Sequence, residues 1–139
     1  MSYELKYETP SIDDYIEIRL AAGLSRKSVE AAEIGLSNTI CAVTIYNDEL
    51  PIGIGRVIGD GGCFFEIVDI AVRPEHQKKG LGEMIMQGLM TYINDNAPDT
   101  AYVSLMADHG TPEFYKRFGF KASLPPEKSG RSLRINRSA

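Results

Sequence analysis

The spacing of apolar residues changes early in the chain from steps of two to steps of four. Residues 3–7 alternate polar and apolar side chains, which predicts an edge strand. Ser11 followed by Asp14 resembles a capping box, so a helix is predicted to begin there, and a second helix is predicted over residues 28–36. The side chains expected on the buried faces are Ile12, Ile16, Leu20 and Leu24 in the first helix and Val29, Ala32 and Leu36 in the second.

The next part of the chain predicts an antiparallel meander of three strands. Residues 39–46, 51–58 and 63–72 are rich in β-branched and other apolar side chains, which are typical of strands. Polar or glycine-rich turns separate these three runs. In the third run only Glu66 and Asp69 interrupt the apolar sequence, so both carboxylates need an explanation.

A helix and a further strand follow the meander. Residues 80–94 predict a helix, and its apolar stripe consists of Leu81, Ile85, Leu89 and Ile93. Residues 101–106 predict a strand, which must run parallel to its partner if the preceding helix is a crossover. The chain therefore combines antiparallel and parallel pairing in one sheet.

The last elements are short. Thr111 and Pro112 are typical of a helix start, and Gly119 is typical of a helix end. Residues 132–136 alternate as a final strand. Taken together, the elements predict one α/β (α+β) domain over residues 1–139, with a mixed, mostly antiparallel sheet flanked by helices.

Composition excludes several classes of function. The net charge of -4 disfavours nucleic acid as the main partner, because duplex binders carry a basic face. No apolar run is long enough to span a bilayer, and the first residues lack a basic and apolar leader, so we expect a cytoplasmic protein without membrane contact. Cys41 and Cys63 are expected to be reduced core residues, and no metal is predicted because His76 and His109 show no ligand spacing.

The strongest functional signal is the loop Gln77–Gly82, which follows an apolar strand and opens a helix. Such a loop turns several backbone N–H groups toward one point at the positive end of the helix dipole, which suits an anion, most often phosphate. Lys78 and Lys79 add positive charge there. The loop predicts a phosphorylated ligand or cofactor. The glycines of residues 53–59 lack the spacing of a dinucleotide fingerprint and are interpreted as strand and turn features.

Three segments carry a resemblance to a known family: residues 69–72, the loop of residues 77–82, and residues 114–120 with the sequence FYKRFGF. With the order of elements, they resemble the GNAT superfamily of acyl-CoA-dependent N-acetyltransferases. The resemblance implies acetyl-CoA as the cofactor. It implies that the backbone of Ile70, Ala71 and Val72 pairs with the pantetheine arm, with the Ile70 amide facing the acyl oxygen. The residues implied to hold the pyrophosphate are Gln77, Lys78, Lys79, Gly80, Leu81, Gly82 and Glu83.

The same resemblance proposes two catalytic side chains. Tyr115 would act as general acid, because a phenol is a weaker acid than a thiol and can protonate a departing thiolate; the alternative is a packed tyrosine. Glu66 would act as general base, and the alternative is a glutamate that faces solvent or pairs with a lysine. The chain departs from the family at Asp108 and Thr111, where many members carry Asn and Ala. His109 is a further candidate base, or part of a turn, and Asp69 is interpreted as structural.

The predicted reaction is acetyl transfer from acetyl-CoA to a primary amine of a small molecule. The two N-terminal helices and the loops around residues 59–61 and 125–126 are expected to set the acceptor. The alternatives are a peptide or protein N-acetyltransferase, which Glu66 favours weakly, and a non-catalytic acyl-CoA-binding sensor. A homodimer is common in the family, but no residue in the sequence establishes one.

Overall fold

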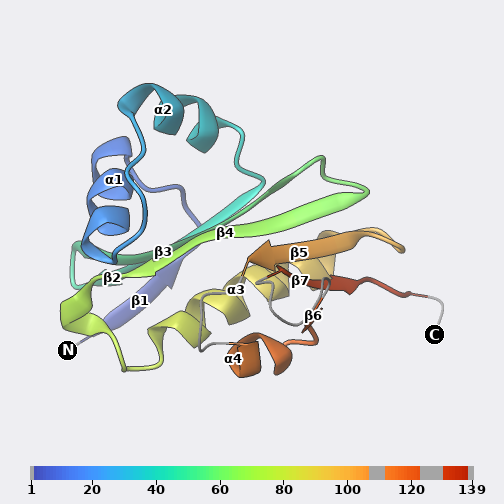
Figure 1. Ribbon diagram of the computed structural model, residues 1–139. Coiled ribbons are helices and arrows are strands. Elements are labelled where there is room, and N and C mark those ends of the chain that lie inside the picture. Colours follow the sequence, from blue (N-terminus) through green and yellow to red (C-terminus); the bar gives the residue numbers. More distant parts are fainter. Residues whose placement is uncertain (1, 107–111, 123–129, 138–139) are drawn as a thin grey trace.

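One sheet separates the helices into two layers in the computed structural model, which describes residues 2–106, 112–122 and 130–137. Helices α1 and α2 cover one face, and α3 and α4 lie on the other (Figure 1). Within the described residues the sheet has seven strands in the order β1-β2-β3-β4-β5-β7-β6. The mixed α/β architecture predicted from the sequence is confirmed.

The elements follow the chain in a simple order. The first half contains β1 Tyr3–Lys6, α1 Ile12–Ala21, α2 Val29–Ser37, β2 Cys41–Asn47, β3 Leu50–Gly59 and β4 Phe64–Val72. The second half contains the 3-10 turn η1 Pro74–His76, α3 Leu81–Asn96, β5 Tyr102–Met106, α4 Pro112–Lys116, β6 Lys121–Ala122 and β7 Gly130–Arg134.

The start of each N-terminal helix is as predicted, but their buried faces differ from the predicted ones. The Ser11 hydroxyl accepts from the Asp14 amide at 3.1 Å and caps α1. However, α1 buries Tyr15, Ile18 and Arg19, whereas Leu20 is 41% exposed. A helix turns about 100° per residue, so a four-residue stripe drifts by about 40° at each step and leaves the buried face.

Two other predicted side chains also need comment. Leu24 lies beyond the end of α1, in the connection to α2, but it is partly buried and packs against the same apolar cluster. Val29 is 58% exposed at the first position of α2, because Ala32 and Leu36, from the next turns, make the packing against α1. The predicted faces are thus wrong at Leu20 and Val29, whereas Ile12 and Ile16 pack against the α1–α2 cluster as expected.

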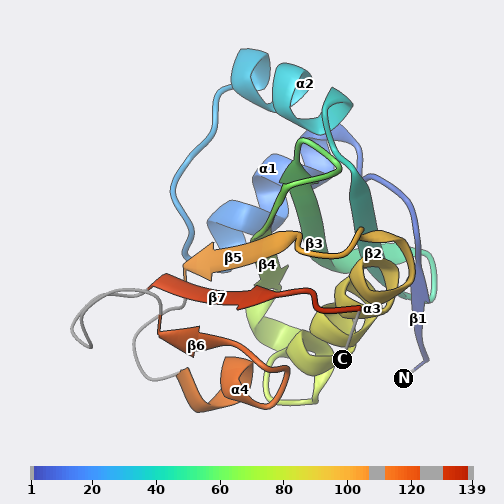
Figure 2. The same cartoon turned by 90° about the vertical axis from the view of Figure 1, so that its right-hand side faces the viewer.

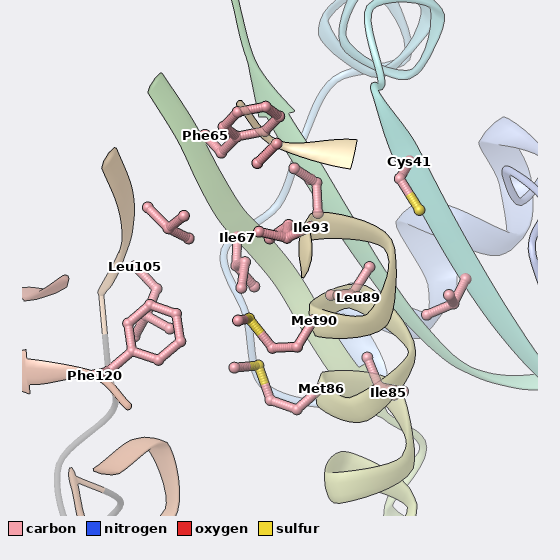
Figure 3. Close-up of a cluster of buried hydrophobic side chains, with 14 of the residues drawn as sticks. Cys41, Phe65, Ile67, Ile85, Met86, Leu89, Met90, Ile93, Leu105 and Phe120 are labelled. Carbon is pink, nitrogen blue, oxygen red and sulfur yellow. The ribbon is translucent and has the colours of Figure 1, made fainter. Parts of the chain in front are cut away.

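Helix α3 packs on the opposite face of the sheet through its predicted stripe. Leu81, Ile85, Leu89 and Ile93 are all buried. Figure 3 shows Ile85, Leu89 and Ile93 facing side chains of β2 and β4, and the same cluster includes Leu81, residues of β5 and Phe120. Gly55 on β3 permits the close approach, because a Cβ at that position would lie 2.4 Å from Cγ2 of Ile85.

The C-terminal half of the sheet confirms the parallel pair and adds a rearrangement. Strands β4 and β5 are parallel, paired from Phe64–Tyr102 to Glu66–Ser104. The last strand, β7, then lies between β5 and β6 and is antiparallel to both (Figure 2). It spans Gly130–Arg134, so it begins and ends earlier than the predicted strand of residues 132–136.

Strand β4 contains a β-bulge that determines which way its side chains point. Ile54 pairs with Ala71 and Arg56 with Val68, so two residues of β4, Asp69 and Ile70, lie opposite Gly55 alone. Asp69 has a φ of 63°, in the left-handed region that Asp enters more readily than most residues. The extra residue resets the alternation, and Asp69 faces the α1 layer.

The structure also bears on the predictions for the two cysteines and for membrane-spanning segments. Cys41 is buried, but Cys63 is exposed, because it lies in the turn before β4 and not within the strand. Over the described part of the chain, no helix is both long and apolar enough to cross a membrane.

Candidate functional site

The loop before α3 has the backbone conformation of an anion site. Lys78 and Gly80 have φ values of 63° and 79°, and Gly80 is the N-cap of α3. Left-handed residues in a short loop turn successive N–H groups to one side, and the first N–H groups of a helix have no partner within it. The Gln77 side chain donates to the Val72 carbonyl at 2.9 Å and fixes the loop to the end of β4.

The space beside this loop fits a phosphate group. A cavity of about 330 Å³ lies there, bounded by the end of β4 and the start of α3. A Cβ at Gly80 or at Gly82 would have no other atom within 4 Å, so both glycines face open space. The residues therefore leave room for a group that approaches the backbone closely, as a pyrophosphate does at a helix N-terminus.

Most of the residues predicted to hold a cofactor line this one cavity. They are Ile70, Ala71, Val72, Gln77, Lys78, Gly80, Leu81 and Gly82. Lys79 and Glu83 do not line it. The Glu83 carboxylate forms an exposed ion pair with Arg117 at 3.0 Å.

A second cavity, of about 400 Å³, brings the two predicted catalytic residues together. Glu66 on β4 and Tyr115 on α4 both line it, with Leu105 of β5 beside them. Ile70 and Leu24 line both cavities, so the two spaces meet at the bulge of β4. A ligand held at the α3 loop can thus extend along β4 to reach Glu66 and Tyr115.

The edge of β4 provides a surface for such an extended ligand. Its pairing with β5 ends at Glu66–Ser104, and β4 continues to Val72 with no strand on that side within the described residues. Backbone groups along an unpaired edge can bind amides of a ligand in the manner of an added strand. The sequence predicted this role for Ile70, Ala71 and Val72, which lie on this stretch.

The floor of the second cavity is a cluster of buried charges around Asp69. Asp69 forms an ion pair with Arg19 and another with Arg56, whose Nε lies 2.8 Å from Oδ2. The Tyr15 hydroxyl donates to the same Oδ2 at 2.8 Å. Burial, and then the hydrogen bond to Asp69, raise the pKa of Tyr15 above its ordinary value, so its hydroxyl remains a donor. The cluster therefore locks the bulge to α1.

Sequence reasoning identified Asp69 as structural but missed its partners. Arg19 and Arg56 interrupt apolar helix and strand patterns, and a buried arginine requires a partner. The two arginines were thus visible in the sequence as residues that need a partner, although the sequence does not show that this partner is Asp69.

Asp108, His109, Thr111 and residues 125–126 lie outside the described residues, and residues 59–61 do not line the cavity. The described part contains no cluster of three or more metal-ligating side chains.

Known proteins resemble this chain in sequence and in fold. Residues 38–122 match the family model of the acetyltransferase (GNAT) domain. A Staphylococcus aureus protein of unknown function, named as a probable acetyltransferase, is 44% identical; the TM-score is 0.84, covering 89% of this chain and 93% of that one. A GNAT family acetyltransferase from Brucella melitensis, solved with acetyl-CoA, is 18% identical with a TM-score of 0.69, covering 97% and 89%, which shows the shared fold.

Curated relatives are longer than this chain. The uncharacterized N-acetyltransferase ycf52 of Gracilaria tenuistipitata var. liui is 25% identical over 104 residues, which are 72% of this chain and 56% of the relative. The chain thus spans little more than half the length of such relatives.

Proposed function

This chain belongs to the GNAT acetyltransferase family, and from that membership we propose that it transfers an acetyl group from acetyl-CoA to the primary amine of a small molecule. The family uses acetyl-CoA, as its solved members with bound acetyl-CoA and CoA illustrate. The cofactor supplies an acetyl group on a thioester, with a thiolate as leaving group. The protein then has to bind the cofactor, orient the amine and move two protons.

One observation carries the proposal: the cavity at the α3 loop and the cavity with Glu66 and Tyr115 meet at Ile70. In the proposed arrangement the loop amides from Gln77 to Gly82 hold the pyrophosphate. The edge of β4 binds the pantetheine arm. The Ile70 amide faces the acyl oxygen, where preorganised donors stabilise developing negative charge.

The two side chains of the second cavity have complementary roles in this proposal. Glu66 accepts a proton from the incoming ammonium, directly or through water, and leaves a neutral amine that can attack. Tyr115 donates a proton to the departing thiolate, and its phenolate takes up the second proton that the nitrogen loses as the amide forms. Holding the amine nitrogen in contact with the acyl carbon contributes further to the rate enhancement, because it converts a bimolecular reaction into an effectively unimolecular one.

The shape of the acceptor space favours a small amine over a protein substrate. The cavity is about 400 Å³ and has a charged floor, so it suits a compact polar molecule. Part of its lining comes from α1 and the connection to α2, in partial agreement with the acceptor region expected from the sequence. A peptide substrate and a non-catalytic acyl-CoA sensor are the two competing functions.

The proposal is tested by measuring thiol release from acetyl-CoA across a panel of amines, with a no-amine blank. The panel contains polyamines, amino sugars and their phosphates, amino acids and lysine peptides. Release that depends on a small amine supports the proposal, and release with peptides alone supports the second function. Tight acetyl-CoA binding with no release above the blank for any amine would favour the sensor.

A further inference from the structure

Arg56 is buried at the floor of the acceptor cavity with part of its guanidinium unused. The residue is 7% exposed and lines the cavity. Its Nε donates to Asp69, and its Nη1 donates to the Gly35 carbonyl at 3.0 Å and to the Thr39 hydroxyl at 2.7 Å. Its Nη2 has no hydrogen-bond partner among the residues that the structure describes. Because Arg56 lines the cavity, this nitrogen is available to donate to an acceptor bound there.

The charged side chains that line the cavity are unbalanced in the same direction, with three cations against the two carboxylates of Glu66 and Asp69. Two buried guanidinium groups, of Arg19 and Arg56, share the single carboxylate of Asp69. Arg19 uses its remaining donors on the Ser25 carbonyl and hydroxyl, both uncharged. Lys27 also lines the cavity and forms no ion pair with a described residue. An excess buried positive charge is costly unless an anion joins it.

From these observations we infer that the acceptor amine also carries an anionic group, a carboxylate or a phosphate. The anion is bound by Arg56 at the floor and Lys27 at the rim of the cavity. This inference rests on the proposed function and specifies its substrate class. Arginine is the side chain best suited to such oxygen anions, because its planar donors match their geometry.

The position of Glu66 is consistent with a substrate that has two opposite ends. Arg56 pairs with Val68 and Ile58 with Glu66, so Arg56 and Glu66 share one face of the sheet on neighbouring strands. Such diagonal positions lie about 8 Å apart at the backbone. Glu66 forms no ion pair with any residue in the described ranges, and its carboxylate would receive the ammonium end. The anion would then lie over Arg56.

The test compares amines that differ only in the anion. Phosphoethanolamine is paired with ethanolamine, and β-alanine with β-alaninamide, using the full chain and saturating acetyl-CoA. We expect kcat/KM to be at least about tenfold higher for the anionic member of one pair, and the pair that responds identifies phosphate or carboxylate. Equal values within both pairs, or a preference for the neutral members, would overturn the inference.

Variants locate the effect at this floor. Lys27→Gln should lower the anionic-to-neutral ratio several-fold, and Arg56→Lys should lower it further, because a lysine keeps the charge but loses the planar fork. Arg26→Gln is the matched control, since it removes one charge from the same exposed connection at a residue that does not line the cavity. An equal loss in the Arg26 and Lys27 variants would indicate long-range attraction and contradict a bound anion.

A binding measurement separates this inference from the proposed function. Inorganic phosphate and succinate are titrated calorimetrically into the wild type and the Lys27→Gln variant, each saturated with CoA so that the α3 loop is occupied. Anion binding that depends on Lys27, without turnover of any amine, would support the anion site and refute the acetyltransferase. Turnover of neutral amines, with no anion binding, would refute the anion site and leave the acetyltransferase standing.

Discussion

Gly82→Asp should separate cofactor binding from folding. Gly82 lies in the first turn of α3, and a Cβ there would have no other atom within 4 Å, so the fold has room for the side chain. Gly80 is a poorer choice, because its φ of 79° would strain any other residue. An acid in the first turn of a helix is stabilised by about 0.3–1 kcal/mol, so the variant should unfold at the same temperature or a higher one.

The same carboxylate should weaken acetyl-CoA binding by repulsion. A charge about 5 Å from a bound phosphate costs about 0.8 kcal/mol in a water-like medium and about 3.3 kcal/mol at an effective dielectric constant of about 20. These energies correspond to a loss of about 4-fold to about 270-fold in affinity. Since Gly82 is only partly buried, we expect the effect to lie between these limits and to shrink at high salt.

The assay is calorimetric titration of acetyl-CoA at low and high salt, with thermal unfolding of the same samples. S-acetylpantetheine, which has no pyrophosphate, is titrated in parallel and should lose nothing in the variant. Gln87→Glu is the control, because it adds one negative charge at an exposed position of the same helix, about 7.5 Å further along its axis.

Two results would refute the assignment of the pyrophosphate to this loop. In the first, a folded Gly82→Asp variant would bind acetyl-CoA as tightly as the wild type. In the second, acetyl-CoA and S-acetylpantetheine would weaken together, which would mean that the variant alters the pantetheine site and not the phosphate site.

Three further predictions concern catalysis, stability and thiol reactivity. Tyr115→Phe should lower kcat about 100-fold or more while the acetyl-CoA Kd changes less than about twofold. An unchanged kcat would show that Tyr115 is not the general acid. Asp69→Asn should lower the urea-derived free energy of unfolding by about 3–5 kcal/mol, because two buried arginines lose their counter-charge, whereas Glu17→Gln, at an exposed ion pair, should cost less than about 1 kcal/mol. Burial raises the pKa of the Cys41 thiol from 9.0 to about 11, which stabilises the fold below pH 9 and is lost as the pH rises toward 11. Ellman's reagent near neutral pH should therefore modify exposed Cys63 in the native protein and Cys41 only after unfolding, and rapid native modification of both thiols would contradict this.

The features that the sequence predicted well depend on local pattern. Helix α3 is one example, since Leu81, Ile85, Leu89 and Ile93 repeat at helical spacing and one continuous face of the sheet receives them. The loop before α3 is another, because glycine permits the left-handed backbone that such a loop contains, as Gly80 shows with a φ of 79°. Both features were recognised without knowing which strands are neighbours.

The features that were missed depend on pairing between distant segments. No local pattern shows that Gly55 stands opposite two residues of β4, so the side of the sheet that Asp69 faces was not predictable. The partners of Asp69 come from α1 and β3, residues 19 and 56, far apart in the chain. The exposure of Cys63 and of Val29 likewise depends on where neighbouring elements end.

The position of β7 has a consequence for how the chain is made. Residues 130–134 pair with residues of both β5 and β6, so until they are synthesised β5 is paired on one side only, with β4, and β6 lacks the strand that it pairs with. The α1–α2 layer and the first four strands can assemble earlier on the ribosome, because their contacts join residues that have already emerged. A ribosome stalled before residue 130 would therefore present an incomplete sheet to chaperones.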